Sequence, residues 1–312
     1  MNRLSHTVAA FATAMLCAFP SQGRVLEVGP SHALTLPSQA AAVAANGDFV
    51  RIDPGLYADC AIWRASRLVI EATGPGVVLA GKSCLDKGIF IISGNDVTVR
   101  GITFVGARVI WHNGAGIRAS GRNLTVEHSR FLDGENGILA GGPSTSVVRI
   151  TDSEFAGNGD CTSACAHGVY AGAPIFLLDI ERCIFRNTRT AHHIKSRARS
   201  TMVIDSRIED GPDGTSSYLI ETPNGGDLLV QGNVLEKGPL TSNSRAAISI
   251  GVEGVTNPTQ KLVIRNNVFR SDVLGRTVFV RNSSAAPVLL EGNTISGDVQ
   301  VLQTGLPGFF GE

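Results

Sequence analysis

The sequence has 312 residues, of which 43% are hydrophobic, 17% are charged and 36 are glycine, and its 27 basic and 27 acidic residues cancel. This composition argues against a disordered chain or a coiled coil, and the balanced charge argues against nucleic acid as a partner. Many short buried strands joined by tight turns are expected instead.

The first segment, residues 1–23, has the pattern of a secretory signal. Arg3 gives it a basic start, and an apolar stretch of 12 residues runs from Val8 to Phe19. That stretch is short of the roughly 20 residues that span a bilayer, so we expect no membrane insertion. The prediction is an exported monomer, periplasmic or secreted, with residues 24–312 as one folded domain.

One pattern recurs along the rest of the chain, in which apolar core positions flank a small polar residue. Val126/Ser129/Phe131 is a clear instance. The intervals fall within the roughly 20–50 residues typical of repeat architectures, in which each unit covers its neighbour's apolar face. No unit has a helical pattern, so each is expected to be one turn of a β-coil. The small polar residues should form a ladder at a bend: Ser129, Ser153, Ser206, Asn233, Asn267 and Asn293, with Cys183 in the same place.

A second strand precedes each core pair, and its residues should alternate between core and solvent. Outward members of successive coils would lie about 4.8 Å apart, the spacing of neighbouring strands. The predicted outward column is Phe90, Arg118, Leu139, Tyr170, Lys195, Glu221, Ser249 and Val280.

Residues 36–57 are expected to cap the coil, with an alanine-rich helix over 38–45, a strand over 49–52 and a turn over 53–55. A cap protects strand edges that would otherwise invite aggregation. With this start and the repeats, the chain resembles the pectin-lyase-like family. The resemblance implies an all-β, single right-handed parallel β-helix with an N-terminal helical cap. It leaves the reaction open, because that superfamily contains lyases, epimerases, hydrolases and adhesins.

The cysteines predict two disulfides in an exported protein. Cys60 and Cys84 are separated by about one coil, and Cys161 and Cys165 bracket a loop of small residues. Cys183 would stay free in the polar ladder. A zinc site at Cys161 and Cys165 is disfavoured because there are only two thiols and no paired histidines.

The segment 186–199, RNTRTAHHIKSRAR, concentrates basic residues without an acid. The β-coil aligns His167 with His192 and Tyr170 with Lys195, and it places Glu221 one coil later. A solvated basic face, or a structural ladder with a Lys195–Glu221 ion pair, is the alternative to a functional site. Cations gathered with histidine and tyrosine suit proton abstraction next to a uronate carboxylate.

Lys195 is the expected base. Neighbouring guanidinium groups should lower its pKa, whereas Glu221 would oppose this effect if it contacts Lys195 instead of substrate or metal. The predicted catalytic residues are Lys195, His193, His192, Arg197 and Tyr170. The predicted substrate-binding residues are His167, Arg118, Tyr218, Glu221, Asn224 and Arg199.

Residues 166–168 and 193–195 resemble two signatures of polygalacturonase-type hydrolases. The paired aspartates of those enzymes are missing, because Glu135 and Ala115 lie in the corresponding regions. We therefore expect a lyase or C5-epimerase acting on an acidic polysaccharide. A non-catalytic glycan-binding or surface protein is the alternative, and a hydrolase fits less well. No metal or other cofactor is required, with calcium as an alternative near Glu221 and Asn224.

Overall fold

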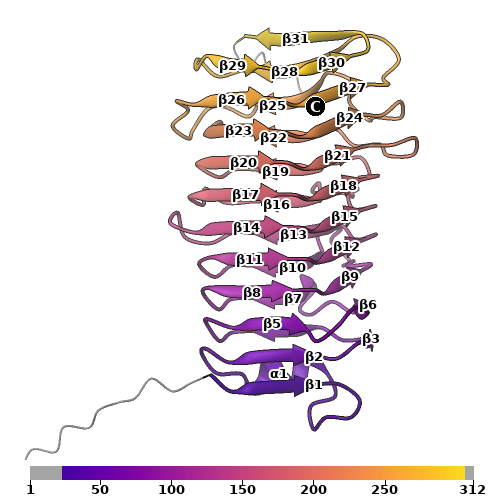
Figure 1. The fold of residues 1–312 in the computed structure, drawn as a ribbon, viewed down its shortest axis with the longest axis vertical. Coiled ribbons are helices and arrows are strands. Elements are labelled where there is room, and N and C mark those ends of the chain that lie inside the picture. Colours follow the sequence, from indigo (N-terminus) through magenta and orange to yellow (C-terminus); the bar gives the residue numbers. More distant parts are fainter. Residues whose placement is uncertain (1–22, 306–312) are drawn as a thin grey trace, which may run out of the picture.

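A computed structural model describes residues 23–305, and they form three parallel sheets that run along one coil (Figure 1). Most of the predicted signal segment and residues 306–312 lie outside the described residues. Sheet A comprises β1 (Val25–Val28), β2 (Phe49–Ile52), β5 (Val69–Ala72), β8 (Val97–Arg100), β11 (Leu124–Glu127), β14 (Val147–Thr151), β17 (Leu177–Glu181), β20 (Ser200–Ile204), β23 (Asp227–Gln231), β26 (Leu262–Arg265) and β29 (Val288–Glu291).

Sheet B follows sheet A in each coil and consists of short strands. They are β3 (Gly55–Tyr57), β6 (Val77–Ala80), β9 (Thr103–Val105), β12 (Arg130–Leu132), β15 (Glu154–Ala156), β18 (Ile184–Arg186), β21 (Arg207–Glu209), β24 (Val234–Lys237), β27 (Val268–Ser271) and β30 (Thr294–Ser296).

Sheet C completes each coil and carries the outward column. Its strands are β4 (Ala61–Trp63), β7 (Gly88–Ile92), β10 (Ala115–Ala119), β13 (Asn136–Ala140), β16 (Val169–Ala171), β19 (Ile194–Ser196), β22 (Ile220–Thr222), β25 (Ala246–Ile250), β28 (Thr277–Asn282) and β31 (Val299–Thr304). The expected parallel β-helix is therefore confirmed, with helix α1 (Pro37–Val43) at its N-terminal end (Figure 1).

The core of the coil contains a stack of phenylalanines, one from each of four consecutive coils: Phe104, Phe131, Phe155 and Phe185. The ring centroids of Phe104 and Phe131 are 5.1 Å apart, and those of Phe131 and Phe155 are 4.8 Å apart. Glycine at 116 is required by this stack, because a Cβ atom there would lie 2.7 Å from the Phe131 ring. Close aromatic contacts of this kind add to the free energy that burial supplies.

The polar ladder is confirmed at the bend between sheets A and B. The Asn267 side chain accepts a hydrogen bond from the Asn233 main-chain N–H (2.9 Å) and donates one to the Val230 carbonyl (3.0 Å). The Cys183 N–H donates to Ser206 Oγ at 3.0 Å, so the buried thiol stands in the same column. Both expected disulfides, Cys60–Cys84 and Cys161–Cys165, are present.

The prediction for the outward column is wrong at its two ends. Phe90 is fully buried, and Ile91 pairs with Arg118 in its place. Val280 is also fully buried, and Arg281 pairs with Ser249. In a strand a shift of one residue moves each side chain to the opposite face. Phe90 belongs inside because its ring packs 5.1 Å from that of Phe104.

Within residues 23–305, no helix has the length and apolar character needed to cross a membrane.

Candidate functional site

The outer face of sheet C brings several of the predicted residues together. Arg118, Leu139 and Tyr170 are partners across β10, β13 and β16. Lys195 continues the column from Tyr170 on β19, and Glu221 follows on β22. Because neighbouring strands lie about 4.8 Å apart, side chains of this column contact one another along the coil axis.

Glu221 is the buried acid of this group, with only 2% of its surface exposed. Its Oε2 atom lies 3.1 Å from His192 Nε2 and 3.0 Å from Lys195 Nζ. These approaches are at ion-pair distance, although neither has good hydrogen-bond geometry. Burial acts to raise the pKa of Glu221, but His192 and Lys195 outweigh it and bring the pKa down to about 2.

Lys195 lies between two carboxylates, which decide the direction in which its pKa shifts. Its Nζ is 2.8 Å from Glu253 Oε1 in addition to its contact with Glu221. Burial acts to lower the pKa of Lys195, yet Glu221 and Glu253 raise it above the ordinary lysine value. Of the two opposed effects expected from the sequence, that of Glu221 prevails over that of the guanidinium groups, because carboxylates are the closest charged neighbours of Lys195.

Arg197 completes the cationic pair on the solvent side. Its Nη2 atom lies 2.7 Å from Glu253 Oε2, and its Nε donates to Tyr170 Oη at 3.0 Å. Asn224 accepts a further hydrogen bond from Arg197. A single carboxylate, that of Glu253, thus joins the two side chains Lys195 and Arg197.

Glu253 was not among the predicted site residues. It belongs to the loop between β25 and β26, and its main-chain N–H donates to the Pro223 carbonyl at 3.0 Å. Asn257 of the same loop donates to the carbonyls of Arg197 and Ala198 at 3.2 Å. These hydrogen bonds hold the loop against the outer face of sheet C. The feature of the sequence that could have pointed to Glu253 was the length of this loop relative to the neighbouring turns.

Two histidines and a tyrosine form a second ladder at the edge of this face. His192 packs 4.8 Å from His167 and 5.2 Å from Tyr218, measured between ring centroids. His167 Nδ1 accepts the His192 main-chain N–H, and His192 Nδ1 accepts that of Tyr218, both at 3.1 Å. Neutral rings therefore carry their proton on Nε2, which in His192 is the atom that faces Glu221.

His167 is a neutral side chain in this setting. Its pKa lies well below the ordinary value because it is fully buried, and the nearby His192, Lys195 and Arg197 act in the same direction. It is suited to support the site through packing and through the proton on Nε2, and not to accept a proton.

Two predicted residues stand apart from the group. His193 is completely buried, and its ring nitrogens contact Thr188 Oγ1 at 2.8 Å and Asp210 Oδ1 at 2.9 Å. This geometry contradicts its expected position on the outer face. The chain bends at His193, just before β19, and the imidazole is held inside by Asp210. Arg199 lies in the bend after β19, and its exposed side chain has no ion pair or hydrogen bond within residues 23–305.

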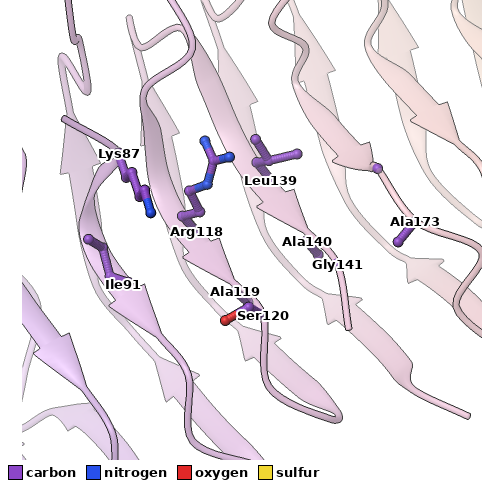
Figure 2. A pocket seen from close by; sticks show the side chains of 10 residues that line it. Lys87, Ile91, Arg118, Ala119, Ser120, Leu139, Ala140, Gly141 and Ala173 are labelled. Carbon is purple, nitrogen blue, oxygen red and sulfur yellow. The ribbon is translucent and has the colours of Figure 1, made fainter. Parts of the chain in front are cut away.

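A hollow of about 390 Å³ opens on the same face beside Arg118 (Figure 2). Lys87, Arg118 and Leu139 project into view from consecutive coils. Arg118 donates a hydrogen bond to the Asn113 carbonyl at 3.3 Å and has no carboxylate partner in the described chain. Burial lowers the pKa of Arg118, so this guanidinium is partly desolvated and unneutralised, as in sites that accept anions.

Calcium binding near Glu221 and Asn224 stays a prediction. In the structure Glu221 faces Lys195 and His192, and the Asn224 oxygen accepts from Arg197. The side chains that contact the Glu221 oxygen and the Asn224 oxygen would compete with a metal ion for the lone pairs of these two atoms.

Comparison with solved structures identifies the fold. A pectate lyase, Pel9A, is 14% identical with a TM-score of 0.55, covering 91% of this chain and 80% of that one. An alginate lyase from Paenibacillus sp. str. FPU-7 is 16% identical with a TM-score of 0.55, covering 89% and 99%. A polygalacturonase from Erwinia carotovora ssp. carotovora is 13% identical with a TM-score of 0.50, covering 94% and 100%.

The chain has the same parallel β-helix fold as these three structures. All three structural neighbours are polysaccharide-active enzymes, but at these identities the likeness shows the fold alone. No protein-family model matches the sequence, and no curated protein matches it.

Proposed function

We propose that this protein binds a uronate-containing glycan along the outer face of sheet C and modifies it by removing the proton next to a carboxylate. The observation that carries the proposal is the position of Glu253. Its carboxylate is held by Lys195 at 2.8 Å and by Arg197 at 2.7 Å, and it is 39% exposed. A sugar carboxylate that displaces Glu253 finds two cations already placed for it.

The same face offers a second position for a negatively charged sugar. Arg118 lies three strands from Lys195, a separation of about 14 Å along the coil axis, and it has no carboxylate partner in the described chain. Leu139 and Tyr170 lie between them and offer apolar surface. A polymer with repeated carboxylates can therefore contact both cationic positions at once.

The chemistry follows from what the two cations can stabilise. Removal of the proton next to a carboxylate develops negative charge on its oxygens, and Lys195 and Arg197 would hold that charge. Tyr170 Oη, which accepts a hydrogen bond from Arg197 at 3.0 Å, is the base that we assign: as a phenolate it takes the proton from the sugar carbon and becomes the neutral phenol. Lys195 then acts chiefly as an electrostatic partner, because its pKa is raised in the free protein.

Glycoside hydrolysis fits the site less well. That reaction needs one carboxyl group with a raised pKa as the general acid. Glu221 and Glu253 have lowered pKa values, since Lys195 contacts both, His192 contacts Glu221 and Arg197 contacts Glu253, and these cations outweigh the effect of burial. A non-catalytic glycan-binding protein is the second candidate, because Lys195 and Arg197 would bind a sugar carboxylate equally well without any reaction.

The proposal includes export, and the two disulfides support it because such bonds persist in oxidising compartments.

Activity on a panel of uronic-acid polymers tests the proposal. Elimination produces a new ultraviolet absorbance, and epimerisation in D₂O incorporates deuterium at C5 without absorbance. We expect Lys195→Ala and Tyr170→Phe to lower turnover by roughly 10² to 10⁴. Arg265→Ala, an exposed cation on β26 of sheet A, is the matched control and should keep full activity.

Other outcomes decide against the proposal. Reducing ends without absorbance would indicate a hydrolase, and binding without turnover would favour the non-catalytic alternative. Glu253→Gln should lower the Kd for a uronate oligosaccharide, since the competing carboxylate is removed. Weaker binding by this variant would mean that Glu253 is not displaced.

A further inference from the structure

Three successive coils place a histidine and two carboxylates together at the turn that precedes sheet C. His112 lies just before β10, Glu135 just before β13, and Asp160 in the longer loop before β16. The coils are in register here, because Ala115 pairs with Asn136 and Ile138 with Val169. None of the three residues belongs to the face that carries Lys195.

We propose that His112, Glu135 and Asp160 bind a divalent transition-metal ion of the zinc type. Each offers one ligand atom, and the three atoms lie within 4.8 Å of one another. His112 Nδ1 is 3.0 Å from Asp160 Oδ2 and 3.9 Å from Glu135 Oε1. Ligands at about 2.1 Å from a tetrahedral ion stand about 3.4 Å apart, so small side-chain movements satisfy the geometry.

The two carboxylates are held in the way that metal-binding carboxylates are. Glu135 Oε2 accepts the Gly114 N–H at 2.5 Å, while its Oε1 has only a long contact of 3.4 Å with the Val109 N–H. Asp160 Oδ1 accepts the Thr162 N–H at 2.7 Å, while its Oδ2 faces His112. Asp160 thus uses one oxygen for the main chain and directs the other toward His112, and Glu135 makes its short main-chain hydrogen bond through Oε2 and has Oε1 as the oxygen nearer to His112.

Charge also favours a dication at this position. Glu135 is 2% exposed and has no lysine or arginine at ion-pair distance within residues 23–305; its one ion-pair contact is with His112. Two carboxylates therefore face a single imidazole, which supplies at most one positive charge. A divalent ion would balance both acids without a further side chain.

One of the three ligands, Asp160, also lines a second cavity of about 470 Å³, so the proposed site is next to open space on this side. Asp160, Arg108 and Arg189 line it. Arg108 and Arg189 each donate a hydrogen bond to a main-chain carbonyl, of Asp133 and Gly134, and neither forms an ion pair in the described chain. A metal ion with three protein ligands keeps an open coordination position. Because Arg108 and Arg189 have no ion-pair partner among the described residues, their guanidinium groups would favour an anion as the further ligand of the metal.

Metal titration of the untagged, EDTA-dialysed protein by calorimetry tests this site without any glycan, so its outcome is independent of the proposed glycan activity. We expect one Zn²⁺ per chain. His112→Asn and Asp160→Asn should each raise the Kd for Zn²⁺ at least tenfold. Co²⁺ should give a visible absorption band that His112→Asn abolishes.

His128→Asn is the matched control, because His128 is exposed on another corner and has the same left-handed backbone conformation as His112, with φ of 49° and 55°. It should bind Zn²⁺ as the unaltered protein does. Circular dichroism establishes whether each variant is folded. If His112→Asn does not fold, the Kd of Asp160→Asn for Zn²⁺ decides the test. Absence of stoichiometric Zn²⁺ binding, or an unchanged Kd in the folded variants, would overturn the proposal.

Discussion

Replacement of Glu221 by glutamine tests the electrostatics of the sheet C face. The substitution keeps the shape of the side chain and removes its charge. The pKa of Glu221 falls from 4.5 to about 2 in the folded protein, and one pKa unit corresponds to about 1.4 kcal/mol. We therefore expect Glu221→Gln to lower the free energy of unfolding by roughly 3 kcal/mol at pH 7.

The pH dependence gives the sharper test. Because the pKa of Glu221 is lower in the folded state, the unfolded chain binds the proton more tightly, so this stabilisation is complete above about pH 5. It is lost as the pH falls from about 4.5 toward about 2. The difference between the two proteins should therefore shrink to roughly half near pH 3.

Urea unfolding followed by circular dichroism at pH 7 and pH 3 measures both quantities. Glu291→Gln is the control, since Glu291 is exposed on β29 and forms no ion pair within residues 23–305. If Glu221→Gln costs no more than this control, or costs the same at both pH values, the contacts with His192 and Lys195 do not stabilise the charged carboxylate.

Two further predictions concern the interior of the coil. Cys183 should not react with alkylating reagents in the native protein, because burial raises its pKa to about 12. The unfolded, unreduced chain 24–312 should show one free thiol group. A count of three thiol groups would contradict one of the two disulfides. Asn267→Ala should cost about 1–3 kcal/mol in urea unfolding, because it removes the side-chain hydrogen bonds to the buried Asn233 N–H and to the Val230 carbonyl. The exposed substitution Thr294→Ala should change stability by less than about 0.5 kcal/mol. Equal losses in the two variants would argue against the ladder.

The sequence alone was sufficient for the coil, the polar ladder and the two disulfides. These features depend on alternation within a strand and on a similar spacing from coil to coil, both of which are visible in the order of residues. The alignment of Tyr170, Lys195 and Glu221 followed from the same regularity. It failed at Phe90 and Val280, where the actual register differs by one residue from the expected one.

The tertiary structure decided what surrounds each charge. Glu253 is 58 residues beyond Lys195, and only the path of its loop brings the two within 2.8 Å. Burial of Lys195 acts to lower its pKa, but the carboxylates of Glu221 and Glu253 outweigh burial and raise it, whereas the nearby arginines in the sequence argued for a lower value. His193 likewise follows His192 directly but points into the core toward Asp210. Local pattern determines which residues share a strand face, whereas loop paths and burial determine which charges meet, because electrostatic effects depend on distance in space and on exclusion of water.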